Sequence, residues 1–169
     1  MAQLSGSAVV QLAFQHANVA LDLSTPAYTF AVKYQKDFPN GTGDSQANDI
    51  WHDRRSLGAS ATETLDFFGG VTNAFGVVLS FTKIKGVFVV ADSNNNAANN
   101  LEIGGNAATV CSLGFVATND KFQLAPGGIF FVTNPIVGWT VSSTTDLLLM
   151  ANDAGTNTIS YDIAVWGVA

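Results

Sequence analysis

Charged side chains and cysteine are both scarce in this sequence. Charged residues make up 12% of the 169 residues, against about 25% in an average globular protein. The surface must therefore be largely neutral and polar, with few strongly hydrated side chains to desolvate when another protein covers it. The lone Cys111 excludes an intrachain disulfide framework and any metal site built on cysteines. We expect Cys111 to be a small buried hydrophobe, and a reactive thiol is the alternative.

Basic residues are few and scattered. The chain has seven lysines and arginines, and its formal net charge is −6. Phosphate binding draws its affinity from clustered basic side chains, so this composition argues against a nucleic-acid partner. Lys83 and Lys85 come closest to a cluster. Because they lie two residues apart on a predicted strand, we expect both on one solvated face.

No apolar run is long enough to cross a membrane. The most apolar stretch, residues 75–91, is broken by Lys83 and Lys85 and falls short of the roughly 20 residues that a spanning helix needs. Residues 1–6 contain no basic segment ahead of a long apolar stretch, so no secretory signal is predicted. We expect a soluble protein made in the cytoplasm, with no membrane partner.

The titratable residues are too few for most catalytic arrangements. His16 and His52 are the only histidines, and neither belongs to a ligand or triad motif. His52 lies in a crowded run, residues 49–55, that could form either a metal or acid/base site or a salt-bridged structural knot. A carboxylate pair for glycoside hydrolysis could be drawn from Glu63, Asp66 and Glu102. The sequence favours a protein that is not an enzyme and that holds no cofactor or metal.

The hydrophobic pattern is that of β-strands. No stretch shows the apolar spacing of an amphipathic helix, and β-branched residues and glycines occur throughout. Short candidate strands recur at intervals of about 8–12 residues, separated by turn-forming segments such as 92–96, 126–128 and 152–157. The prediction is an all-β fold, an antiparallel β-sandwich that is jelly-roll-like, with about ten to twelve short strands and little helix. Besides 28–35 and 159–166, the candidate strands are residues 8–14, 19–23, 62–68, 77–81, 84–91, 100–103, 121–124, 129–133, 139–142 and 146–151.

Two candidate strands alternate with a period of two. In residues 28–35, one face carries Tyr28, Phe30, Val32 and Tyr34, which predicts a half-buried strand. In residues 159–166 the second face includes Trp166, so that strand is expected to be covered on both sides.

One stretch lacks regular alternation. Residues 37–61 open on a polar, turn-rich segment and are predicted to be a long contact loop. We expect one sandwich domain over residues 28–169, with residues 1–27 as an amino-terminal strand or arm packed on the domain or reaching from it. Exposed aromatic residues could serve a protein interface or a sugar-stacking platform, although a core role is favoured for the three tryptophans.

Six segments of the sequence occur in a characteristic order, residues 41–57, 59–66, 71–76, 81–85, 126–128 and 156–163. Over residues 28–165 the sequence thereby resembles a group of small virion proteins of tailed bacteriophages. The resemblance implies a structural role in the particle, as a head decoration or cement protein with a jelly-roll-like sandwich on the major capsid lattice. The location would be the virion head surface, after synthesis in the host cytoplasm.

This resemblance implies two kinds of partner, the major capsid protein and further copies of the chain as a dimer or trimer. The residues predicted to make protein contacts are Phe38, Trp51, His52, Arg54 and Arg55. The alternative function is a receptor- or carbohydrate-binding module of a tail or fibre, which would use exposed aromatics and the asparagine-rich turns at residues 94–100.

Overall fold

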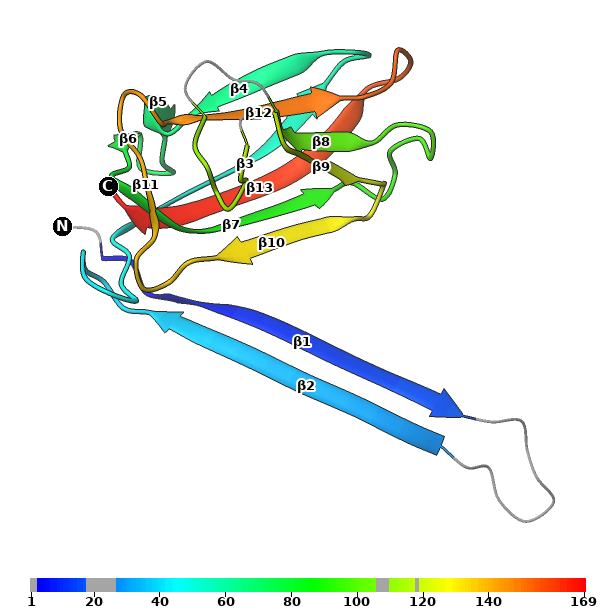
Figure 1. The fold of residues 1–169 in the computed structure, drawn as a ribbon, viewed down its shortest axis with the longest axis horizontal. Coiled ribbons are helices and arrows are strands. Elements are labelled where there is room, and N and C mark those ends of the chain that lie inside the picture. The colour runs from blue at the N-terminus through cyan, green and yellow to red at the C-terminus, as the bar shows by residue number, and fades with distance from the viewer. Residues whose placement is uncertain (1–2, 18–26, 106–109, 118) are drawn as a thin grey trace.

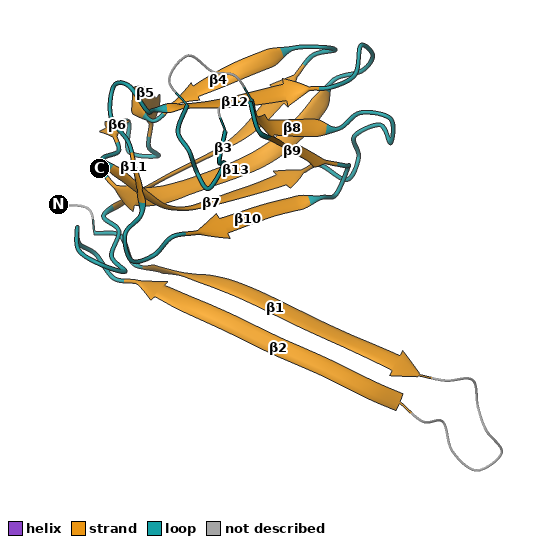
Figure 2. Cartoon of the chain, viewed as in Figure 1, coloured by secondary structure: helices purple, strands orange, loops and turns teal. Residues whose placement is uncertain are grey.

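The protein is an all-β molecule. The computed structural model describes residues 3–17, 27–105, 110–117 and 119–169, and these residues form thirteen strands and no helix (Figures 1 and 2). Every strand pairing among them is antiparallel. The predicted all-β antiparallel fold is therefore confirmed. No helix long and apolar enough to cross a membrane occurs in the described ranges.

Two sheets face each other around one core (Figure 1). The first has the strand order β10 (Ile129–Thr133), β7 (Lys83–Ala91), β13 (Ile159–Val168) and β3 (Asp49–Leu57), with β11 (Trp139–Thr140) also paired to β7. The second has the order β4 (Thr62–Asp66), β12 (Leu147–Asn152), β8 (Leu101–Gly104) and β9 (Lys121–Leu124). A short pair, β5 (Phe68–Thr72) and β6 (Val78–Ser80), closes one end.

The core is filled by alternate residues of the two sheets. In β13, Tyr161, Ile163 and Val165 are buried, and they pack in one cluster with Ile103 and Met150 of the second sheet. This is the pattern expected when each strand turns one face inward. Cys111 belongs to the same cluster and is fully buried, as predicted, and this burial raises the pKa of its thiol to about 12.

A long two-stranded ribbon leaves the sandwich. The strands β1 (Gly6–Ala17) and β2 (Ala27–Phe38) pair over their whole length and diverge from the sandwich as a separate arm (Figure 1). We call this ribbon the arm. Its strands belong to none of the other sheets. The division predicted after residue 27 falls after the first residue of β2, so the arm contains residues from both sides of it.

The arm is attached at its base by a small apolar cluster. Ala8 and Phe38 of the arm are buried with Ala47, and Phe131 and Trp166 of the first sheet pack against them. The rings of Phe38 and Trp166 meet edge to face, with centroids 5.8 Å apart. We call this cluster the joint. It covers part of the second face of β13, as predicted for that strand.

The predicted contact loop of residues 37–61 is wrong over much of its length. Residues Asp49–Leu57 form β3, which pairs with β13 along nine residue pairs. Trp51 and Leu57 point into the core, but the two inward positions between them carry the charged residues Asp53 and Arg55. Because charged residues occupy inward positions, the sequence of β3 lacks the apolar alternation by which a half-buried strand is recognised.

The half-buried strand predicted at residues 28–35 is also corrected. The strand exists as part of β2, but its apolar face is open, with Tyr28 68% and Tyr34 54% exposed. A period of two shows that the faces differ; it does not show that a second layer covers the apolar one. Here no other described element lies over that face beyond the joint.

Lys85 does not share a solvated face with Lys83. Lys85 is fully buried, and its ammonium donates to the carbonyl oxygen of Ile136 at 2.6 Å. The β7–β13 register shifts beside Trp166 and Gly167, so that Lys85 is the extra residue of a β-bulge. The extra residue of a bulge changes which side chains of the strand point inward. The spacing of the two lysines in the sequence does not reveal such a bulge.

Most of the other predicted strands are present with small changes of boundary. The turns at residues 92–96, 126–128 and 152–157 occur where predicted, with Gly127 at φ +77° and Asn157 at φ +62°. β5 was not predicted as a separate strand. The strand predicted at residues 19–23 lies outside the described residues.

Candidate protein-contact site

The five predicted contact residues do not form one surface. Phe38 is 3% and Trp51 is 4% exposed, so both offer almost no area to a partner. Phe38 belongs to the joint and Trp51 to the main core, where its ring meets that of Phe67. The remaining three, His52, Arg54 and Arg55, lie on β3 and alternate between its two faces.

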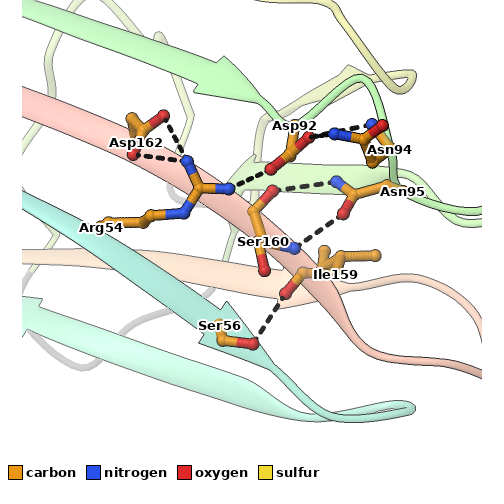
Figure 3. A network of polar contacts seen from close by, with 8 residues as sticks. All are labelled: Arg54, Ser56, Asp92, Asn94, Asn95, Ile159, Ser160 and Asp162. Carbon is orange, nitrogen blue, oxygen red and sulfur yellow. Dashed lines mark hydrogen bonds and ion pairs between the residues drawn. The ribbon is translucent and has the colours of Figure 1, made fainter.

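Arg54 lies on the outer face of the first sheet and joins three segments (Figure 3). Its guanidinium bonds to Asp92, in the turn after β7, and to Asp162 on β13, at 3.2 Å. The backbone N–H of Asn94 is the main cause that lowers the pKa of Asp92, with Arg54 contributing. Because the Arg54 side chain is 58% exposed, these pairs contribute little stability and remain accessible to a partner.

The same turn is fastened to β13 by a second residue. Asn95 donates from its side-chain amide to the carbonyl oxygen of Ser160 at 2.9 Å and accepts from the Ser160 N–H at 2.8 Å (Figure 3). Ser56 on β3 donates to the carbonyl oxygen of Ile159 at 3.3 Å. These contacts hold the strand ends in place beneath Arg54.

Arg55 points to the inside and links the two sheets. It donates to Glu63 of β4 at 3.0 Å and to Asp53 at 3.0 Å, and the buried Tyr161 hydroxyl also donates to Glu63. Glu63 and Asp53 raise the pKa of Arg55, while burial is the main cause that raises the pKa of Tyr161. Arg55 therefore ties the sandwich together and is only partly open to a partner.

The crowded run around His52 thus separates into two networks. Arg54 and the exposed His52 face outward, whereas Asp53 and Arg55 face inward, because successive residues of a strand point to opposite faces. The salt-bridged knot predicted from the sequence is present in this divided form. Over the described ranges, no three histidine, cysteine, aspartate or glutamate side chains gather in a way that could hold a metal ion.

The acidic residues considered for glycoside hydrolysis each have a local partner. Glu63 accepts from Arg55 and Tyr161, and Glu102 accepts from Lys121 at 2.8 Å. Asp66 accepts from the backbone N–H of Phe68 at 2.7 Å. Each of the three carboxylates is therefore held in place by a structural contact.

An exposed apolar surface lies outside the five predicted contact residues. It lies on one side of the arm, where cross-strand partners such as Leu12 with Val32 and Phe14 with Phe30 point the same way. We call this side the aromatic face of the arm. Its members are 42% to 68% exposed and are Leu12, Phe14, Tyr28, Phe30, Val32 and Tyr34. The sequence signal for this face was the alternation of apolar and polar residues in both 10–14 and 28–34. The sequence does not show whether another element covers the apolar side.

A second apolar surface lies on the first sheet, on the side away from the core. We call it the outer sheet face. Between it and the base of the arm is a cleft of about 740 Å³. Phe88 is 36% and Ile129 is 60% exposed there. The apolar residues of this face that line the cleft are Ile50, Phe88, Ile129, Phe131, Ala164 and Trp166.

The aromatic residues bear on the sugar-stacking alternative. Trp51 is in the core, and Trp139 and Trp166 are partly buried against neighbouring rings and strands. The most exposed aromatic rings are instead Phe75, Tyr28 and Phe14. Phenylalanine lacks the polar group that a wet binding platform uses, which favours a protein interface over a sugar site.

No protein-family model and no curated protein sequence matches the chain.

Proposed function

We propose that this chain is a structural protein of a tailed bacteriophage particle, a decoration or cement protein that binds the outside of the major capsid lattice and stabilises the head. In this role it performs no chemistry and needs no cofactor. The partners are the major capsid protein and further copies of the chain. The resemblance of residues 28–165 to small phage virion proteins supports this class of particle.

The observation that supports an assembly role is the arm. The arm extends away from the sandwich (Figure 1), its aromatic face is exposed, and a free soluble monomer rarely keeps such a surface uncovered. Only 12% of residues are charged, so the remaining surface also has a low desolvation cost in contacts. Both features suit a protein that works inside an assembly.

A cement protein acts by binding the assembled shell better than its separate subunits. Stabilisation then follows from mass action, because binding energy is available only in the assembled state. Repetition over a symmetric lattice makes modest contacts effective, since neighbouring copies are held together by the shell. Of the residues predicted as contacts, His52 and Arg54 are the exposed ones and are assigned to the shell.

Cryo-electron microscopy of the virion that encodes the chain tests this function directly. Density for many copies on the head lattice is the expected result, with the outer part of β3 near the shell. Density confined to the tail tip or fibres would overturn the head assignment in favour of receptor recognition. A glycan-array signal that is lost on Phe75→Ala, together with absence of shell binding, would support the same alternative.

A further inference from the structure

The aromatic face of the arm needs a cover that its own chain does not provide. Two-stranded ribbons are only marginally stable in water, and a third layer against the apolar face is what usually stabilises them. Beyond Ala8 and Lys36, the paired strands continue to Ala17 and Ala27 with no other described strand beside them. Phe14 remains 65% exposed along this free part.

The outer sheet face of the same chain lacks a cover as well. Apolar residues from all four main strands meet there, including Ile50 of β3 and Phe88 of β7. The arm contacts this face at the joint, lines the cleft beside it as far as Leu12, and diverges from it beyond that point (Figure 1). One chain therefore carries two unpaired apolar surfaces that its own geometry keeps apart.

We propose that the arm of a second copy of this chain packs its aromatic face on the outer sheet face, and that the first copy returns the same contact. The occupant of the cleft is thus another copy's arm. In a reciprocal pair each chain gives one arm and receives one, so that every apolar surface described above is covered and the contact is closed. The capsid role is not needed for this inference.

The dimensions fit this arrangement. The free part of the arm, residues 9–17 paired with 27–35, is about 30 Å long and about 10 Å wide. The nine residues of β7 give the receiving sheet a similar length of about 30 Å. Two reciprocal contacts would remove roughly 1,200 Å² from water in total, which is within the range of stable, specific protein interfaces.

The distribution of polar residues on the arm supports the same orientation. The side opposite the aromatic face carries Gln11, Gln15, Lys33 and Gln35, which are exposed. With the aromatic face on a neighbour, these polar side chains remain in water. An interface in the reverse orientation would bury a lysine and several amides without known partners.

The first test compares two adjacent substitutions on the arm of the full-length purified protein. Val32→Lys places a charge in the aromatic face, whereas Ala31→Lys places the same charge on the opposite side. The mass in solution is measured over a range of concentrations by analytical ultracentrifugation. We expect wild type and Ala31→Lys to self-associate, and Val32→Lys to lose at least about tenfold in affinity.

A second test identifies the receiving surface. Phe30→Cys and Phe88→Cys variants, one carrying a mass tag, are mixed and oxidised. Cys111 can stay in place because it is buried and its thiol pKa is about 12. Disulfide-linked species containing one of each variant are expected. A mixture of Ala31→Cys with Phe88→Cys is the matched control and should give far less product.

Three results would overturn the inference. These are a monomer at all concentrations up to about 100 μM, equal association of Val32→Lys and Ala31→Lys, and crosslinks only between two Phe30→Cys chains. If the protein is monomeric and Val32→Lys abolishes binding to phage heads, the arm binds the shell and the cement function stands without arm exchange. Arm exchange together with absence from the head would instead refute only the cement function.

Discussion

The indole ring of Trp166 lies over Gly86, its cross-strand partner, in the space that a side chain at position 86 would occupy. This relationship fixes the joint, because the ring that covers Gly86 also contacts Phe38 of the arm and stacks on Phe131 at a centroid distance of 6.2 Å. The glycine is required for space, and its backbone is not in the left-handed region.

Gly86→Ala should displace Trp166 and loosen the arm. The added methyl group would overlap the ring atoms, and overpacking of this kind costs about 1–3 kcal/mol. Urea unfolding followed by tryptophan fluorescence measures the change. Gly155→Ala is the control, since its methyl group would meet only Ser60 at ordinary contact distance. Equal stability of the two variants would show that the ring does not depend on Gly86.

Tyr161→Phe should destabilise the sandwich by about 1.5–3 kcal/mol. The hydroxyl is the buried donor to the Glu63 carboxylate, and hydrogen bonds to charged groups contribute about this much. A double-mutant cycle with Glu63→Gln isolates the pair. The two losses should not add, because each removes the same contact. Strict additivity would mean that Tyr161 and Glu63 act independently.

The buried Lys85 should make stability depend on pH. Burial lowers its pKa below 10.5, so between the folded pKa and 10.5 the unfolded chain binds more protons than the folded one. Stability from this group therefore rises with pH through that window. Comparing wild type with Lys85→Met from pH 7 to 10.5 should show the wild type gaining relative to the variant.

Lys83→Met provides the control for that experiment, because Lys83 lies on the same strand and is exposed. Removing its charge takes away the smaller of the two causes that lower the pKa of Lys85, so this variant should keep the rise of stability with pH in a weakened form. A constant difference between wild type and Lys85→Met would show that the lysine is not desolvated in solution.

Asn152→Asp should cost about 1–3 kcal/mol, although the shape is unchanged. The Asn152 amide donates to the carbonyl oxygens of Gly58 and Asn157, each at 2.9 Å, which an aspartate cannot do. Thermal unfolding at pH 7 measures the loss. Lowering the pH should restore part of it as the new carboxyl is protonated. An unchanged melting temperature would contradict this role.

Self-association and shell binding should be only mildly sensitive to salt. The contact proposed for the arm is apolar, and the charge assigned to the shell contact, Arg54, is already paired with Asp92 and Asp162. Raising NaCl from about 0.05 to 0.5 M screens charge pairs but not apolar contacts, so affinities should change by less than about tenfold. Release of the protein from heads by moderate salt would point to a charge-driven contact.

The sequence was most informative where alternation and turn chemistry agreed. Residues 159–165 and the turn at Asp92 were predicted correctly because each depends on local spacing. β3 was missed because Arg55, a charged residue, points inward to a partner 8 residues away, Glu63. The buried Lys85 was missed because its position depends on a bulge set by pairing with β13.

The candidate surfaces show the same limit. The alternation of Phe30 and Val32 was visible in the sequence, but its exposure depends on the angle at which the arm leaves the sandwich. That angle is set by a few contacts of residues far apart in the chain, such as Phe38 with Trp166. Trp51 was predicted to be a contact residue because residues 37–61 were interpreted as a contact loop, whereas its side chain is in the core.

Because the joint is small and the arm is long, a small rotation at the joint would cause a large displacement at the far end of the arm. Its strands run about 40 Å from the base to Ala17 and Ala27, so a rotation of about 10° at Phe38 and Trp166 would move that end by about 7 Å. The sandwich would keep its shape during such a movement. Identical subunits could then reach neighbours on a curved lattice whose spacings differ by several ångström, which flat contacts between rigid bodies do not allow.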